Sequence, residues 1–154
     1  MSREFRFSSH RLLELLASAK CPVKESELKW KDRGSSGKEL RLALDLVDGP
    51  FAGFVLYLAA GDVKDVTTYR AALILEGERV RGVDYSSIRR RRFYKAYIER
   101  GWHENLIDPN LPTADTNQNQ HRPLPDFQPT HLNDFLRKVC RMWQIEFEFE
   151  EGLL

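Results

Sequence analysis

Cationic and aromatic residues gather in one segment near the middle of the chain. The run SSIRRRRFYKAYIERGWHEN, from Ser86 to Asn105, places four successive arginines before several aromatic residues. Arginine and lysine neutralise phosphates, and aromatic rings stack on unpaired bases. On a strand, alternate side chains point to opposite sides, so one outer side would interleave both kinds of residue. The residues predicted to bind RNA or single-stranded DNA are Arg89, Arg90, Arg91, Arg92, Phe93, Lys95 and Tyr97.

Other interpretations of this segment stay open. As a helix it would begin at Ser86 or Ser87 and end at Gly101; we favour a strand, because aromatic residues suit a pleated surface and the preceding elements are predicted strands. The arginines also suit a solvated sheet edge that resists pairing with another copy. Alternatively, they pair with the acidic tail that includes Glu146 and Glu151, in the same chain or in a partner.

Charge is segregated along the chain and supports the partner alternative. The whole sequence carries a net charge of +1, but residues 79–100 hold eight basic and two acidic side chains, whereas the tail holds four glutamates. A neutral protein as a whole does not attract polyanions, so any nucleic-acid binding must be local. The competing prediction is a protein-interaction module or homodimer that joins the basic segment to an acidic partner.

Three further residues could carry acid–base chemistry. His103, Glu104 and His121 would cleave a phosphodiester as general acid and base if they met in space, with the four arginines stabilising charge on phosphorus. We favour binding over catalysis, because no nucleophile motif supports an enzyme. No cysteine pair or second histidine has the spacing of metal ligands, so neither a metal site nor a cofactor is expected. Asp84 is expected in a turn.

The stretch from TYRAALILEGERVRGVDY through FYKAYIERGWHENLIDP resembles small uncharacterised bacterial and prophage-borne proteins. In those proteins an antiparallel hairpin precedes a histidine-containing strand, and some resemble the toxin half of toxin–antitoxin pairs. The resemblance rests on Arg81, Asp84, Tyr94 and His103, and covers about a third of the chain. It implies a bacterial protein and, for the toxin-like members, a small ribonuclease. Where a histidine pair is expected, this chain has residues 93–95, Phe-Tyr-Lys.

The elements that must position these residues follow from periodicity. Leucines at helical spacing follow Ser8 and Ser9, and a second apolar stripe follows Thr130, the expected cap of a C-terminal helix. Between them, alternating runs such as ELRLALDLV predict strands joined by short turns, one at Gly77. The sequence IEFEFE predicts a last strand. The fold class is therefore α+β, an antiparallel meander of about five to six strands with an N-terminal and a C-terminal helix packed on one face.

Length and composition predict one domain spanning residues 1–154. Residues 108–129 hold five of the seven prolines together with a polar run, and we expect a long surface loop there. We expect a cytoplasmic protein without membrane contact, because no apolar run approaches the ~20 residues of a membrane span and no secretory signal is visible. Cys21 and Cys140 are expected to be free thiols, with Cys140 buried on a helix.

Overall fold

The computed structural model describes residues 8–23, 29–91, 97–107 and 120–146. Its elements, in chain order, are α1 (Ser9–Ala17), β1 (Lys20–Pro22), β2 (Lys31–Arg33), β3 (Gly37–Leu46), β4 (Gly49–Ala60), the 3-10 turn η1 (Val66–Thr68), β5 (Tyr69–Leu75), β6 (Glu78–Ser86), β7 (Arg90–Arg91), β8 (Tyr97–Ile98), β9 (Gly101–Leu106), β10 (Gln120–Pro123) and α2 (Leu132–Met142).

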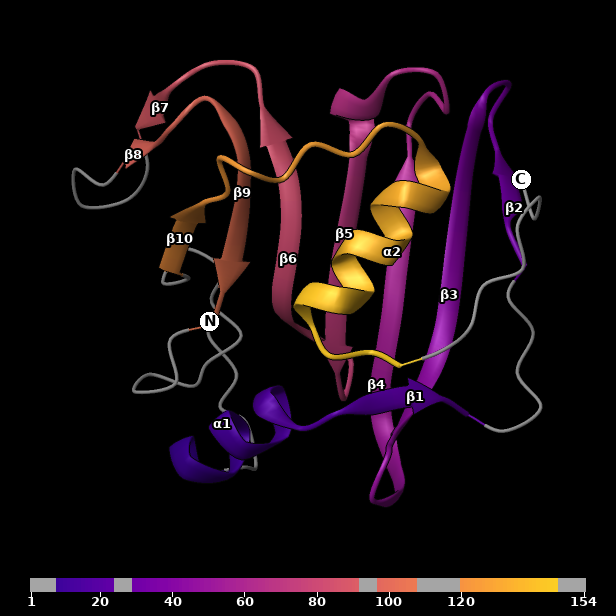
Figure 1. Ribbon diagram of the computed structural model, residues 1–154, viewed down its shortest axis with the longest axis vertical. Helices are drawn as coiled ribbons and strands as arrows, with labels where there is room; N and C mark the ends of the chain where they lie inside the picture. The colour runs from indigo at the N-terminus through magenta and orange to yellow at the C-terminus, as the bar shows by residue number, and fades with distance from the viewer. Residues whose placement is uncertain (1–7, 24–28, 92–96, 108–119, 147–154) are drawn as a thin grey trace.

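One antiparallel sheet of eight strands dominates the molecule (Figure 1). Seven strands follow the order β1-β3-β4-β5-β6-β9-β10, and β2 pairs separately with β3. The predicted antiparallel sheet with two helices is confirmed, but the predicted count of five to six strands is too low. The strands β1, β2 and β10 have only three or four residues each. Such short edge strands leave no alternating pattern in the sequence.

The central hairpins form where the sequence predicts them. In β3, Leu40, Leu42 and Leu44 are buried, and the residues between them are more exposed. The strands β5 and β6 are joined by two residues, Glu76 and Gly77, which both have positive φ angles of 51° and 82°. A two-residue hairpin turn with positive φ at both positions matches the twist of the flanking strands, and glycine adopts this conformation without strain.

Both helices contribute to the hydrophobic core formed by the described residues. Figure 1 shows α2 lying across one face of the sheet, in front of the central strands. Phe135 of α2 packs edge-on against Tyr69 of β5, with 5.5 Å between the ring centroids. From α1, Leu12, Leu15 and Leu16 join the same buried cluster. The sequence predicts Thr130 as the cap of α2, whereas His131 occupies that position and accepts a hydrogen bond from the Asp134 amide.

A buried lysine joins the C-terminal ends of the two helices. The ammonium group of Lys20 donates hydrogen bonds to the carbonyl oxygens of Leu16 (3.1 Å), Ser18 (2.8 Å) and Trp143 (3.4 Å). Burial, and secondly the positive charge of Arg81, lower the pKa of Lys20 to about 8. The three carbonyls belong to the last turns or ends of α1 and α2, where backbone acceptors lack partners within the helix. Lys20 therefore satisfies both helix ends at once.

The arginine-rich segment is not one continuous strand. The strands β7 and β8 pair antiparallel with each other, with Arg90 opposite Ile98 and Arg91 opposite Tyr97, so the chain reverses direction between them. The predicted alternation of residues along a single strand is therefore wrong for this segment as a whole, because residues before and after the reversal lie on different strands. Residues 92–96 lie outside the described part of the chain.

Two other predicted segments differ in part from expectation. The predicted loop 108–129 contains β10, which pairs with β9 from Gln120 to Pro123; residues 108–119 lie outside the described part. Of the predicted last strand, Ile145 makes a single parallel bridge to Lys20, and residues 147–154 are not described. In the described ranges, neither helix has the length and apolar character that crossing a membrane requires.

Candidate functional site

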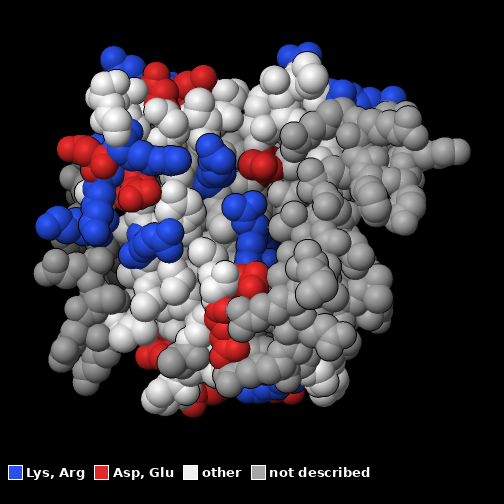
Figure 2. All heavy atoms as spheres, turned by 180° about the vertical axis from the view of Figure 1, so that it is seen from behind, with Lys and Arg blue, Asp and Glu red and all other residues white. Residues whose placement is uncertain are grey.

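The face of the sheet turned away from α2, here called the rear face, carries a row of residues that crosses five strands and ends on a sixth. Residues paired in register on neighbouring strands point to the same face. The row consists of Arg41, Tyr57, Ala72, Gly82, Asn105 and His121. Figure 2 shows this face: basic groups lie across its left and centre, with acidic groups beside them and uncharged side chains between.

The three predicted acid–base residues do not all meet. His103 and Glu104 are neighbours on β9, so their side chains point to opposite faces of the sheet. His103 and His121 share the rear face, with 6.1 Å between their ring centroids. Glu104 lies on the face covered by α2. The fold thus brings His103 and His121 together and places Glu104 on the opposite face of the sheet.

Glu104 is a buried anchor between three strands and α2. Its Oε2 atom accepts hydrogen bonds from Arg81 (2.7 and 3.1 Å) and from the indole of Trp143 (2.7 Å), and its Oε1 atom accepts one from Arg122 (2.5 Å). The Arg81 guanidinium also lies over the Trp143 ring, 5.5 Å from its centroid. A buried carboxylate is tolerated when its oxygens are paired in this way. Glu104 holds β6, β9, β10 and the end of α2 together.

Asp84 takes the place beside His103 that Glu104 was expected to fill. It lies on β6 rather than in the predicted turn, directly opposite His103 in register. Its Oδ1 atom is 2.5 Å from Nε2 of His103, an ion-pair distance, and accepts a hydrogen bond of 3.4 Å from the Asn105 amide nitrogen. The single oxygen atom of the Asn105 amide, Oδ1, is 2.5 Å from Nδ1 of His121. Two histidines, one aspartate and one asparagine therefore form a chain of polar contacts on the rear face.

Asp84 is the accessible member of this cluster. Its side chain is 39% exposed, whereas that of His103 is 3% exposed. Both ring nitrogens of His103 and Nε2 of His121 are shielded from solvent. His103 therefore contacts Asp84 from the neighbouring strand, and of these two groups Asp84 is the one that a ligand can reach.

Two arginines of the rear face are exposed and have no side-chain partner in the described ranges. Among the described residues, the side chains of Arg70 on β5 and Arg79 on β6 make no hydrogen bond or ion pair. Arg79 reaches this face because of a β-bulge: Leu73 pairs with Arg81 and Ile74 pairs with Arg79, which leaves one extra residue in β6. In a regular strand Arg79 and Arg81 would share a face. The bulge sends Arg81 to Glu104 and Arg79 to the rear.

Small residues make a hollow between these arginines, here called the central hollow. It has a volume of about 40 Å³, and the residues that line it include Tyr57, Arg70, Ala72, Arg79, Gly82, Asp84 and Asn105. A Cβ atom on Gly82 would lie 3.4 Å from the Ala71 carbonyl oxygen and 3.7 Å from Cδ of Arg79. At one side, the guanidinium of Arg41 lies over the Tyr57 ring at 4.8 Å, and the Tyr57 hydroxyl donates to Glu39.

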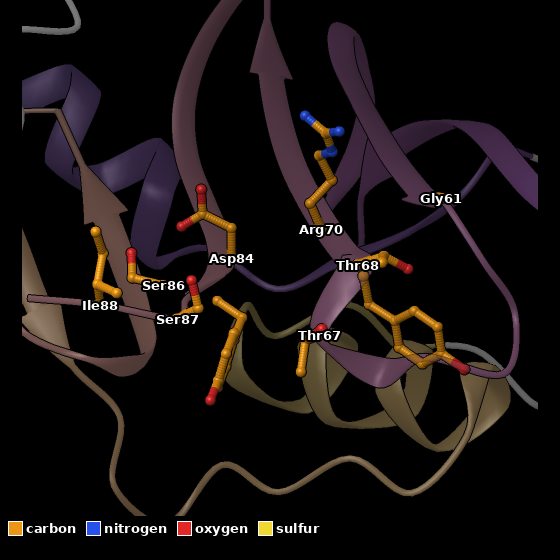
Figure 3. Close-up of a pocket in the computed structure, with 10 residues that line it drawn as sticks. Gly61, Thr67, Thr68, Arg70, Asp84, Ser86, Ser87 and Ile88 are labelled. Atoms are coloured by element: carbon orange, nitrogen blue, oxygen red, sulfur yellow. The ribbon is translucent and has the colours of Figure 1, made fainter.

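A larger hollow, here called the end hollow, adjoins the central hollow where β5 begins and β6 ends (Figure 3). Its volume is about 500 Å³, and it shares Arg70 and Asp84 with the central hollow. Figure 3 shows Arg70 and Asp84 pointing to the same side from neighbouring strands. The remaining lining is mostly hydroxyl-bearing, with Thr67, Thr68, Tyr69, Tyr85, Ser86 and Ser87, together with Gly61 and Ile88.

The structure describes only part of the surface predicted from the arginine-rich segment. Arg89 is exposed and pairs with Glu99 at 2.9 Å. For Arg90, Arg91 and Tyr97 the backbone alone is described, in β7 and β8. The other predicted binding residues, Arg92, Phe93 and Lys95, lie outside the described part, as does most of the acidic tail. Binding through this segment, to nucleic acid or to an acidic partner, stays a prediction.

The described ranges give no support for metal binding or for thiol chemistry. There, no three His, Cys, Asp or Glu side chains come together as metal ligands. Cys140 is buried on α2, as predicted, and burial raises the pKa of its thiol to about 12. The thiol is therefore protonated at neutral pH, and a protonated thiol is a poor nucleophile.

Comparison of the chain with protein-family models, with curated proteins and with solved structures gives no match. The resemblance to bacterial and prophage-borne proteins therefore stays a prediction, and function has to be argued from the geometry of the rear face.

Proposed function

We propose that this protein binds single-stranded nucleic acid across the rear face of its sheet. The observation that carries the proposal is the position of Arg70 and Arg79, two exposed arginines on neighbouring strands that have no partner in the described part of the chain. They flank a hollow whose floor is made of Ala72 and Gly82. Two guanidinium groups without a partner in the described ranges, beside a hollow lined by small residues, are suited to a ligand that carries successive negative charges.

Phosphates are the ligand groups that fit these arginines. A guanidinium group donates several hydrogen bonds in a fixed plane and matches a phosphate with two of them. Neutralising phosphates releases counterions, which favours binding at low salt even when the net charge of the protein is close to zero. The net charge of +1 therefore does not oppose a local site.

Aromatic and planar groups beside the arginines can receive bases. The Tyr57 ring is held in place by its hydroxyl hydrogen bond to Glu39 and by the Arg41 guanidinium above it. Bases of single strands stack on aromatic rings and on arginine planes alike. A strand that follows the row of rear-face residues would place its backbone near Arg70 and Arg79 and a base near Tyr57 or Arg41.

The proposal also requires that the rear face is not covered by a helix. We infer that α1 and α2 both pack against the opposite face, as the sequence predicts, since their apolar residues enter one common cluster. An antiparallel sheet that is buried on one face and wet on the other is a common arrangement. On this face Arg41, Arg70 and Arg79 are exposed, so their guanidinium groups are open to a ligand.

The test is fluorescence anisotropy with labelled single-stranded RNA and DNA of mixed sequence at low salt, alongside the matching duplexes. Wild type is expected to bind the single strands, and the variant Arg70→Gln/Arg79→Gln is expected to bind them at least tenfold more weakly. Arg141→Gln, an exposed arginine on α2, is the matched control. Absence of binding by wild type, or equal binding by both variants, would refute the proposal.

Cleavage of bound RNA is a second candidate, favoured by the meeting of Asp84, His103 and His121 on the same face. Asp84 would accept the proton of a 2′-hydroxyl, the 2′-oxygen would attack phosphorus, and the 5′-oxygen would leave with a proton from solvent. His103 would hold Asp84 in position. Degradation of RNA by wild type but not by His103→Ala supports this candidate. Equal degradation by both proteins, or none by wild type, dismisses it.

A further inference from the structure

We infer that the end hollow receives an unpaired guanine base of the bound strand. This inference rests on the proposed function and names the base that the rear face selects. It depends on two side chains, Asp84 and Arg70, which line the hollow from neighbouring strands and point to the same side (Figure 3).

Asp84 supplies the acceptor side of the pocket. An ionised carboxylate only accepts hydrogen bonds, so its ligand must present N–H or O–H donors. Guanine presents two adjacent donors, its N1–H and its 2-amino group. Adenine and cytosine present one amino group next to a ring nitrogen that would repel the carboxylate, and uracil presents one N–H between two carbonyl oxygens. With its side chain 39% exposed and contacted by His103 from the neighbouring strand, Asp84 matches guanine best among the four bases.

Arg70 supplies the donor side. Its guanidinium makes no hydrogen bond or ion pair within the described ranges. Arginine pairs with the O6 and N7 acceptors of guanine, which continue around the base from its N1–H donor. Because Ala71 pairs with Val83, Arg70 and Asp84 are the next residues outward on adjacent strands. Side chains at such positions stand about 5 Å apart at their Cβ atoms. One acceptor and one donor group can therefore address the donor and acceptor edges of a single flat base.

The remaining walls suit a nucleotide. Ile88 is 66% exposed and gives an apolar surface against which a base can lie. Ser87 and the Tyr85 ring also line the hollow, and the Tyr85 ring is fixed edge-on against Trp102 at 5.5 Å. The volume of about 500 Å³ lies in the range of roughly 300–1,000 Å³ that is typical of small-ligand sites.

The test compares seven-nucleotide strands that are identical except at the central position, which is guanine, inosine, adenine or uracil in a uridine background. Inosine keeps N1–H, O6 and N7 but lacks the 2-amino group. Wild type is expected to bind the guanine strand about tenfold more tightly than the adenine strand, with inosine between them. Parallel DNA strands, and competition by free guanosine monophosphate, distinguish RNA, DNA and a free nucleotide as the source of the base.

Asp84→Asn is the decisive variant, because an amide offers one donor and one acceptor in place of two acceptors. It is expected to lose the preference for guanine while binding the adenine strand at least as tightly as wild type, because the substitution removes a negative charge beside the phosphate-binding arginines. Asp48→Asn, an exposed aspartate in the β3–β4 turn, is the matched control, and circular dichroism verifies that both variants fold. Equal binding of all strands by wild type, or a preference that survives in Asp84→Asn, overturns the inference but leaves the proposed function standing. Failure to bind any strand overturns both.

Discussion

His103 lies directly opposite Asp84 on the neighbouring strand, with Nε2 of the imidazole 2.5 Å from Oδ1 of the carboxylate. The imidazole is buried, and the carboxylate reaches the surface where the two hollows of the rear face meet. A buried group that holds an exposed one fixes its direction before any ligand arrives, which lowers the ordering cost of binding.

A double-mutant cycle tests this contact. His103→Leu and Asp84→Ala are each expected to lower the free energy of unfolding, and their effects should be coupled by about 1–2 kcal/mol, because removing either partner already removes the contact. Urea unfolding of the wild type, both single variants and the double variant gives the coupling energy. His103→Leu combined with Asp48→Ala is the control and should show additive effects. Additivity in the first cycle would mean that the contact contributes nothing.

Replacing the buried carboxylate of Glu104 should be far more destabilising than replacing an exposed one. Glu104→Gln leaves Arg81 and Arg122 without their anionic partner and should lower the unfolding free energy by about 3–5 kcal/mol. Glu99→Gln, which removes the partner of the exposed Arg89, should cost less than about 1 kcal/mol. Chemical denaturation of both variants measures the difference. Similar losses in the two variants would show that Glu104 is not the anchor described above.

Stability should depend on pH through Lys20. Its pKa is lowered from 10.5 to about 8 in the folded protein, so between these values the unfolded chain binds the extra proton and unfolding becomes less favourable as pH rises. Below pH 8 the lysine is charged in both states and this gain is absent. The free energy of unfolding of wild type relative to Lys20→Met should therefore rise by about 1–3 kcal/mol between pH 8 and 10.5.

Urea unfolding at a series of pH values measures the Lys20 effect, with Lys64→Met, an exposed lysine, as the control. The wild type and Lys64→Met should keep a constant difference over the same range. A constant difference between wild type and Lys20→Met as well would show that the carbonyl groups of both helix ends keep the ammonium charged despite its burial.

Filling the central hollow should weaken binding without unfolding the sheet. Gly82 has an ordinary strand conformation, and a Cβ atom there meets only contacts of 3.4 Å or longer. Gly82→Val suits a strand and adds volume between Arg79 and Asn105, so we expect a several-fold weaker affinity for single strands at nearly unchanged thermal stability. Gly77→Val, in the hairpin turn with φ of 82°, should instead destabilise the fold. An unchanged affinity in a folded Gly82→Val variant would place the ligand elsewhere.

The sequence predicts the sheet well and the rear-face site poorly. Alternating leucines in β3 and the glycine of the β5–β6 turn are local signals, and both lead to the correct elements. The site depends on register between strands, which no local pattern contains. Tyr57 and Asn105 are far apart in sequence and share a row only because three intervening strand pairings align them.

Particular residues show why the remaining predictions differ. Arg79 and Arg81 look equivalent in an alternating pattern, but the bulge in β6 sends them to opposite faces. His103 and Glu104 look like a catalytic pair because they are adjacent, yet adjacency on a strand separates them. Pairing His103 with Asp84 requires knowing that β6 and β9 are neighbours in the sheet, whereas the sequence pattern places Asp84 in a turn. The missing information was the order of the strands.

The most direct measurement of the central claim is the salt dependence of single-strand binding. The logarithm of the association constant should fall linearly with the logarithm of the salt concentration, and Arg70→Gln/Arg79→Gln should reduce the slope by about 1.4, because each phosphate contact on a single strand contributes about 0.7. Arg141→Gln should keep the slope of wild type. A slope that is the same in the double variant and in wild type would contradict the assignment of phosphate binding to the rear face.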